Sequence, residues 1–183
     1  NEEKLVEIGR LIDYYMNEYK DKLVYDGESE ILDLSTIRLQ LETFTYDIIQ
    51  GKCLWREIRA FSRHPSSGVL LKVKLDNGNE VEATLGHSFI VKRGENVLTI
   101  DGADLEEGDL IPVVSGGSVI EWRRVIATEY VTGHEGYVYD FDVDLTQNFA
   151  VEPAGAFLHN SQLLQYVARI APRAIYTTGK GSS

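Results

Sequence analysis

The sequence predicts an all-β domain with one amphipathic helix at its N-terminal end. Three observations predict it: a helical repeat near the start, many short runs of β-forming residues after residue 44, and turns with Gly and Asn between them. The chain has 183 residues, 43% of them hydrophobic and 26% charged. That is enough for one well-filled core, so one main domain is expected.

The helix is predicted over residues 3–19. Its apolar residues recur at helical spacing and form one stripe: Leu5, Ile8, Leu11, Ile12, Tyr15 and Tyr19. We expect this stripe to pack on the core.

The strands are predicted from short runs rich in β-branched and aromatic residues. They cover residues 44–49, 54–61, 69–75, 80–84, 89–92, 97–100, 110–114, 119–130 and 137–143. Asn77-Gly78 stands between two of these runs and predicts a tight hairpin, because this pair accepts positive φ values. Residues 94–96 predict a second turn, and residues 115–118 form the one flexible-looking stretch.

The last part of the chain differs from the rest in charge. Residues 161–183 hold three basic side chains and no acidic one, so the first 160 residues hold 15 basic and 29 acidic ones, a net charge of −14 against −11 for the whole chain. Leu163, Leu164, Val167 and Ile170 again take helical spacing until Pro172 interrupts it. We therefore expect two pieces, residues 1–160 and a separate helical segment, residues 161–183.

Composition also excludes several classes of function. The acidic balance argues against a general nucleic-acid-binding surface, which needs clustered Lys and Arg. The single cysteine, Cys53, excludes an internal disulfide and argues against a cysteine-based zinc site, so no metal or other cofactor is predicted. Because no apolar run approaches ~20 residues and no signal peptide is evident, we expect a cytoplasmic protein without membrane contact.

The tripeptide His159-Asn160-Ser161 can break a peptide bond. The amide nitrogen of Asn160 can attack its own backbone carbonyl, forming a five-membered succinimide and releasing whatever follows. Such a well-oriented nucleophile gains an effective concentration of ~10⁵ M or more. His159 can polarise that carbonyl or protonate the leaving amine, and Ser161 would be the free hydroxyl nucleophile. Any three residues can fall in this order, so the tripeptide alone decides nothing.

A second pair of reactive groups follows the run that begins at Glu80. Thr84 and His87 stand three apart on a tight bend. His87 could protonate a departing amide nitrogen while Thr84 hydrogen-bonds the same group. Taken alone, these residues are better explained as a threonine that ends a strand and a histidine bonded locally.

Together these residues resemble the motifs of inteins, the self-excising elements of the Hedgehog/intein (Hint) fold. Residues 78–89 (GNEVEATLGHSF) resemble the motif with Thr and His three apart, and residues 105–110 (LEEGDL) resemble the Gly-Asp turn that follows it. Residues 138–143 (VYDFDV), with Asn148-Phe149 shortly after, are similar to the penultimate motif, and residues 156–161 (AFLHNS) to the C-terminal splice junction. The resemblance implies a horseshoe-like β fold and single-turnover protein splicing by acyl shift, transesterification and Asn cyclisation.

The same resemblance assigns roles at the two splice junctions. His87 and Thr84 would activate the N-terminal scissile bond. His159 and Asn160 would carry out cyclisation, and Ser161 would be the second nucleophile, which accepts the N-terminal host segment.

Asp140 lies in the penultimate motif, and Gln147 lies shortly after it. Asp140 would help to organise the transfer between the two junctions, and a solvated carboxylate at a strand end is the alternative. Gln147 stands where many inteins have a histidine before the Asn-Phe pair. Cyclisation would then rely on His159 or on water.

The front of the intein pattern is missing, because inteins begin with a Cys or Ser nucleophile on a short strand and no such motif precedes Asn1. Residues 7–12 resemble the segment that follows this strand, so roughly ten to twenty-five residues are expected to be absent. Cys53 lies inside a β-like run, as expected of a small buried hydrophobe. The leading interpretation is a C-terminal split intein that splices in trans with an N-terminal fragment. A contiguous intein that has lost its first residues remains the alternative.

Residues 161–183 resemble the segment after the Walker A lysine of archaeal minichromosome maintenance (MCM) helicases, which makes such a helicase the expected host. Residues 114–137 are too few for the endonuclease that many inteins carry, so a mini-intein is expected. The tail lacks a phosphate loop of its own, because Ala174 stands where the first glycine is required, and ATP hydrolysis by this chain alone is not expected. A helicase fragment and a non-catalytic Hint-like binding module are the alternatives from other classes.

Overall fold

The computed structural model describes residues 3–85, 88–152, 154–159 and 167–172. These residues form one α-helix, α1 (Ile8–Glu18), and three 3-10 helices, η1 (Lys20–Lys22), η2 (Leu34–Ile37) and η3 (Gly102–Asp104). Their strands are β1 (Lys4–Glu7), β2 (Val24–Asp26), β3 (Ser29–Asp33), β4 (Leu41–Asp47), β5 (Lys52–Pro65), β6 (Val69–Leu75), β7 (Glu80–Ala83), β8 (Ser88–Arg93), β9 (Asn96–Asp101), β10 (Leu110–Val114), β11 (Ile120–Thr132), β12 (Tyr137–Val143), β13 (Asn148–Glu152), β14 (Ala156–His159) and β15 (Val167–Pro172). The predicted class, all-β with one N-terminal helix, is confirmed.

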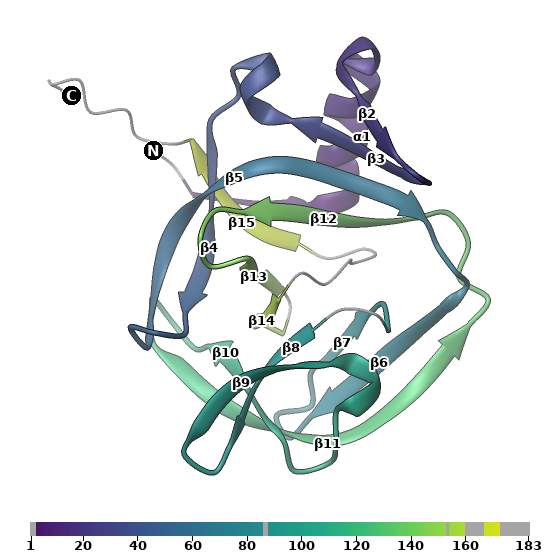
Figure 1. The fold of residues 1–183 in the computed structure, drawn as a ribbon. Helices are drawn as coiled ribbons and strands as arrows, with labels where there is room; N and C mark the ends of the chain where they lie inside the picture. The colour runs from purple at the N-terminus through teal and green to yellow at the C-terminus, as the bar shows by residue number, and fades with distance from the viewer. Residues whose placement is uncertain (1–2, 86–87, 153, 160–166, 173–183) are drawn as a thin grey trace, which may run out of the picture.

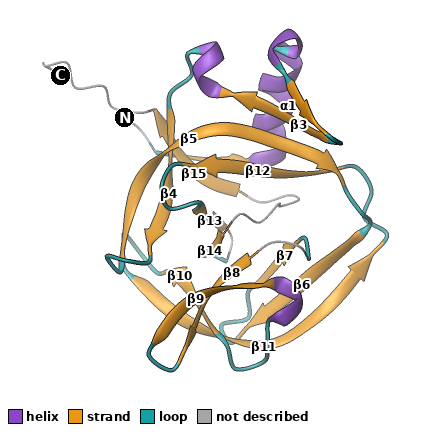
Figure 2. Ribbon diagram, in the orientation of Figure 1, coloured by secondary structure: helices purple, strands orange, loops and turns teal. Residues whose placement is uncertain are grey.

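The strands join into one curved sheet in the order β2-β3-β5-β4-β15-β13-β14-β8-β10-β11-β6-β7. Strand β12 pairs with β5, β9 with β8, and β1 with β15. The long strands β5 and β11 curve around the molecule, and β13, β14 and β8 lie between them (Figures 1 and 2). The β13–β14 hairpin therefore lies in the middle of the fold. No helix among the described residues is long and apolar enough to cross a membrane.

Local turn chemistry explains the predicted hairpin between β6 and β7. Gly78 has a φ of 86°, and its N–H donates to the carbonyl of Leu75 at 3.0 Å. This positive φ is the conformation that an Asn-Gly pair favours. Strands β5 to β12 lie within a few residues of the runs predicted for them.

Two local predictions are wrong. Lys4–Glu7, assigned to the helix, is strand β1, and Val167–Pro172, expected to be helical, is strand β15. Strand β15 has ladder partners on both edges, and its alternate residues Ala168 and Ile170 face the core. Tertiary pairing thus overrides the helical spacing of the tail. Leu163 and Leu164 lie outside the described residues.

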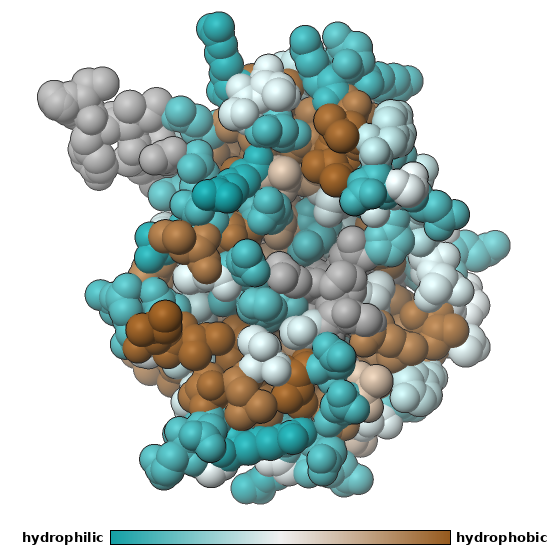
Figure 3. All heavy atoms as spheres, viewed as in Figure 1, coloured by the Kyte–Doolittle hydropathy of each residue, from teal (hydrophilic) through white to brown (hydrophobic). Residues whose placement is uncertain are grey.

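The core consists of a large cluster and a smaller one. Helix α1 buries Ile8, Ile12 and Met16 completely in the large cluster, which confirms the amphipathic helix. The smaller cluster is formed by β4, β8, β13 and β14, with the buried residues Phe44, Tyr46, Ile90, Ala150 and Phe157. On the viewed surface, apolar patches are separated by hydrophilic areas (Figure 3).

Helix α1 lies close against β12 at Gly9. A Cβ atom added to Gly9 would lie 2.9 Å from the ring of Tyr139. The hydroxyl of Tyr139 donates to Asp13 Oδ2 at 2.8 Å, and Arg63 donates to Asp13 Oδ1 at 2.5 Å. The ring therefore cannot shift without disturbing this network, and the approach of α1 requires glycine.

Gly9→Ala should lower the free energy of unfolding by about 1–2 kcal/mol, because overpacking against the held ring outweighs the better helix propensity of alanine. Urea denaturation measures the change. Asn17→Ala, at an exposed position of the same helix, is the control and should raise the stability slightly. A Gly9→Ala protein that is more stable than the parent would contradict the close packing.

Candidate functional site

The candidate site is built around β14, whose last residue is His159. On one edge β14 pairs with β13, which places His159 opposite Asn148. On the other edge β14 pairs with β8, which places His159 opposite Ser88. Ser88 begins β8 shortly after the bend at Thr84. The two ladders thus bring together the Thr-His motif and the C-terminal motif, which lie far apart in the sequence.

Asn148 holds the β13–β14 hairpin against β4. Its side chain is fully buried, and its Oδ1 accepts from the backbone N–H of Tyr46 at 2.9 Å and from Thr45 Oγ1 at 2.8 Å. Its Nδ2 donates to the carbonyls of Tyr46 at 2.7 Å and Thr146 at 3.1 Å. Because an unsatisfied buried polar group costs about 1–3 kcal/mol, these bonds fix the register next to His159. Sequence analysis assigned Asn148 no role, and the only signal was an amide that begins an apolar run.

His159 is half-buried, and its Nδ1 atom is shielded from solvent without a hydrogen-bond partner among the described residues. Burial lowers the pKa of His159. The neutral imidazole, which predominates at pH 7, offers one donor and one acceptor. It can therefore move a proton at the adjacent peptide bond.

Thr84 follows β7 and begins the bend that leads into β8. Its hydroxyl oxygen is buried and has no hydrogen-bond partner among the described residues. Buried hydroxyls usually have a partner, so this group is placed to bond a further segment. His87, Asn160 and Ser161 lie outside the described residues.

Asp140 lies on β12 opposite Ser62 of β5. Its Oδ1 atom is buried without a partner among the described residues, and burial raises the pKa of this carboxyl well above its ordinary value. The ring of the next residue, Phe141, packs on Phe149 of β13 with 4.9 Å between centroids. Asp140 therefore lies on a strand that contacts the hairpin but is not paired with β14.

Gln147, directly before Asn148, has a φ of 55°, in the left-handed region that non-glycine residues seldom adopt. It lies in the turn between β12 and β13, where Thr146 also bonds Asn148. The hydrogen bonds of Asn148 hold this turn in place.

The predicted Gly-Asp turn is held by an ion pair away from β14. Gly108 has a φ of 93°, and the nearly buried Asp109 accepts from Arg93 Nε at 2.7 Å and from the N–H of Glu106 at 2.8 Å. Burial alone would raise the pKa of Asp109, but the bonds from Arg93 and Glu106 leave it lowered. This motif anchors the loop before β10.

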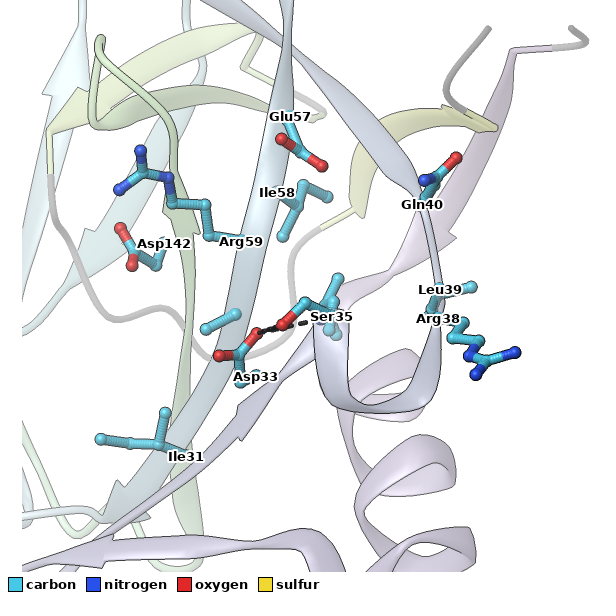
Figure 4. A pocket seen from close by; sticks show the side chains of 12 residues that line it. Ile31, Asp33, Ser35, Arg38, Leu39, Gln40, Glu57, Ile58, Arg59 and Asp142 are labelled. Atoms are coloured by element: carbon cyan, nitrogen blue, oxygen red, sulfur yellow. Dashed lines mark hydrogen bonds between the residues drawn. The ribbon is translucent and has the colours of Figure 1, made fainter. Parts of the chain in front are cut away.

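The cavities do not coincide with these groups. One of about 750 Å³ lies between η2 and β5, where Asp33, Arg38, Glu57, Arg59 and Asp142 surround it (Figure 4). Thr84, Asp140 and His159 are not among its lining residues. Within the described part of the chain, no group of three or more His, Cys, Asp or Glu side chains is placed to hold a metal ion.

No family model matches the chain. It is 38% identical over 123 residues to the DNA polymerase of Methanocaldococcus jannaschii, covering 67% of the chain and 7% of that polymerase. It is 29% identical over 164 residues to the RNA polymerase subunit Rpo1C of the same organism, covering 89% of the chain and 18% of the subunit. The chain thus spans less than a fifth of either relative.

Solved structures match over most of the chain. The transcription factor IIB Mvu mini-intein superimposes with a TM-score of 0.74 at 25% identity, covering 86% of this chain and 91% of the mini-intein. The PabCDC21-1 intein has a TM-score of 0.73 at 23% identity, covering 83% and 87%.

The described residues therefore have the Hint fold, and the chain belongs with the inteins. Its sequence is related to segments of archaeal DNA and RNA polymerases.

Asp140→Asn should raise the free energy of unfolding at pH 7.5 and change it little at pH 4. Because the folded-state pKa of Asp140 is raised, the unfolded chain loses this proton first, and stability is lost as pH rises from about 3.8 through the folded pKa. Asparagine does not titrate, so the variant does not lose this free energy of unfolding as the pH rises. Urea denaturation at both pH values measures it, with Asp26→Asn, an exposed position of β2, as the control. Equal effects at both pH values would contradict a buried carboxyl.

Proposed function

We propose that this chain carries out protein splicing, with its C-terminal junction between Asn160 and Ser161. The observation that supports it is the position of β14, which ends at His159 between β13 and β8. His159 thereby lies opposite Ser88, the first residue of β8, and Thr84 precedes Ser88 by four positions in the sequence. In both Thr84 and His159, a buried polar atom has no partner among the described residues.

At the C-terminal junction, the side-chain nitrogen of Asn160 attacks the carbonyl carbon of Asn160. The peptide bond to Ser161 breaks, a succinimide forms, and the proton lost by the side-chain amide balances the one gained by the leaving amine of Ser161. The neutral imidazole of His159 can relay that proton through its acceptor and donor nitrogens. Before this step, the hydroxyl of Ser161 attacks the ester or thioester that joins the N-terminal host segment to the first nucleophile. The new ester to Ser161 forms, the bond to the first nucleophile breaks, and the proton of the hydroxyl goes to that leaving oxygen or sulfur.

At the N-terminal junction, Thr84 and His87 hold the scissile peptide and protonate its departing nitrogen. Asp140 has a raised pKa and stays protonated to higher pH than an ordinary aspartate, so it can donate a proton during the transfer between the junctions.

We further propose that the first nucleophile lies on a segment outside residues 1–183, supplied in trans as in a split intein. Cys53 pairs with Tyr46 across β5 and β4 and packs on the smaller core cluster, and β4, β15 and β13 separate its strand from β14 in the strand order. It is therefore poorly placed to attack near His159. The DNA upstream of the codon for Asn1 distinguishes the two arrangements: a start codon supports a split gene, and an in-frame nucleophile strand supports a contiguous intein.

The host proposed for this intein is an MCM-like helicase, from the likeness of residues 161–183 to the segment after its Walker A lysine. In that host Ser161 would bind Mg²⁺ at the ATP site after splicing. The relatives found by sequence are polymerases, so the tail alone supports this host.

Asn160→Ala should abolish release of the 23-residue tail, because alanine has no side-chain nitrogen to form the succinimide. Ser161→Ala is the matched control: it should abolish ligation of host segments but leave tail release intact, since cyclisation needs no hydroxyl. Mass spectrometry over time measures tail release in the purified chain, and it measures ligation after an N-terminal fragment that carries the first nucleophile is added. Tail release from Asn160→Ala at the parent rate would refute the proposed reaction.

A further inference from the structure

Strand β15 lies inside the sheet although it follows the proposed cleavage point. One edge of β15 pairs with β1, and the other pairs first with β13 and then with β4. It is the link between β4 and β13 in the strand order, and it lies beside both strands in the fold (Figure 1). The register pairs are Lys4↔Ile170, Leu5↔Arg169, Val6↔Ala168 and Glu7↔Val167 on one edge, and Val151↔Ala168, Glu152↔Val167, Ile170↔Thr43, Ala171↔Glu42 and Pro172↔Leu41 on the other.

Splicing transfers every residue after Asn160 to the host, so β15 must leave the intein. Its departure would leave the facing edges of β1, β4 and β13 without this partner. It would also open the core where Ala168 and Ile170, 0% and 7% exposed, now pack. Unpaired strand edges and core cavities are both unfavourable. The excised intein therefore needs another strand in this place.

The fit of β15 is imperfect at its C-terminal end. Pro172 pairs with Leu41 but has no N–H to donate to the ladder. A cavity of about 560 Å³ lies beside this end, lined by Val6, Leu11 and Tyr15 together with Ile170. Protein interiors are normally close-packed, so a strand with larger apolar side chains would fill this place better.

The direction of β15 shows which segment could replace it. Strand β15 runs antiparallel to β1. A segment directly ahead of β1, joined to it by a tight turn, would also run antiparallel to β1 and could take the same edge. Its other edge would then meet β13, the strand in which Asn148 faces His159.

We propose that the place of β15 is a binding slot for the extended apolar segment that carries the first nucleophile, and that β15 fills it until this segment displaces it. The inference rests on the proposed function, because splicing supplies both the departing tail and the incoming strand. The tail thereby keeps the unpaired chain folded and blocks its N-terminal site. Displacement frees the tail and seats the nucleophile in one step.

The test uses the full chain with Cys53→Ser, Asn160→Ala and Ala168→Cys, so that the tail stays attached and one thiol reports on β15. A copy of residues 165–172 with Pro172→Val is fused ahead of Asn1 through a short Gly-rich linker, where it competes with β15 within one molecule. A matched fusion carries Ile170→Asp in the copy. The probe is the rate at which maleimide modifies the Ala168→Cys thiol.

Without the fused strand, this thiol should react with maleimide at least about tenfold more slowly than the same thiol in the urea-unfolded chain. Only local opening of the folded chain exposes it. The Pro172→Val fusion should remove most of this protection, and the Ile170→Asp fusion should keep it. The proposed binding slot would be contradicted if the thiol were equally protected from maleimide in all three chains. It would also be contradicted if the thiol were unprotected in the chain without a fusion. Tail release is measured separately with Asn160 intact, so failure of splicing and failure of strand exchange remain distinguishable.

Discussion

The structure of the site depends on the pairing of β14 with two strands at once. His159 lies opposite Asn148 on one side and Ser88 on the other, so a single short strand aligns the residue before Asn160 with the first residue of β8. Asn148 fixes this register through four hydrogen bonds to β4 and to the turn before β13. If β13 slipped by one residue, the buried amide would lose these partners and His159 would face another residue.

Three polar groups assigned to the site are shielded from water. Thr84, Asp140 and His159 each have a buried polar atom without a partner among the described residues. Such groups cost stability, and they persist where a reaction uses them. Burial moves the pKa of Asp140 up, toward the pH range where proton transfer is effective, and it moves the pKa of His159 down, which keeps the imidazole neutral at pH 7.

Local chemistry made part of this fold predictable. The apolar stripe of α1 and the Asn-Gly turn at Gly78 act through neighbours in the sequence, and both are present. Strand β15 was not predictable, because its helical spacing is local whereas its partners on β1, β4 and β13 are distant. The role of Asn148 was hidden for the same reason, since its partners lie on a strand about one hundred residues earlier. The motifs predict which residues react, but the ladder that brings His159 to Ser88 appears only in three dimensions.

The rate of tail release after substitution of single histidines tests most directly whether this arrangement performs the proposed reaction. His64 is a suitable comparison, because it also lies on a strand, is half-buried, and has a pKa lowered by burial. If the imidazole beside the junction moves the proton, His159→Ala should slow tail release by ~10²–10⁴-fold, whereas His64→Ala should leave it unchanged. Equal rates for the two variants, both folded, would contradict the assignment of the splice junction to the end of β14.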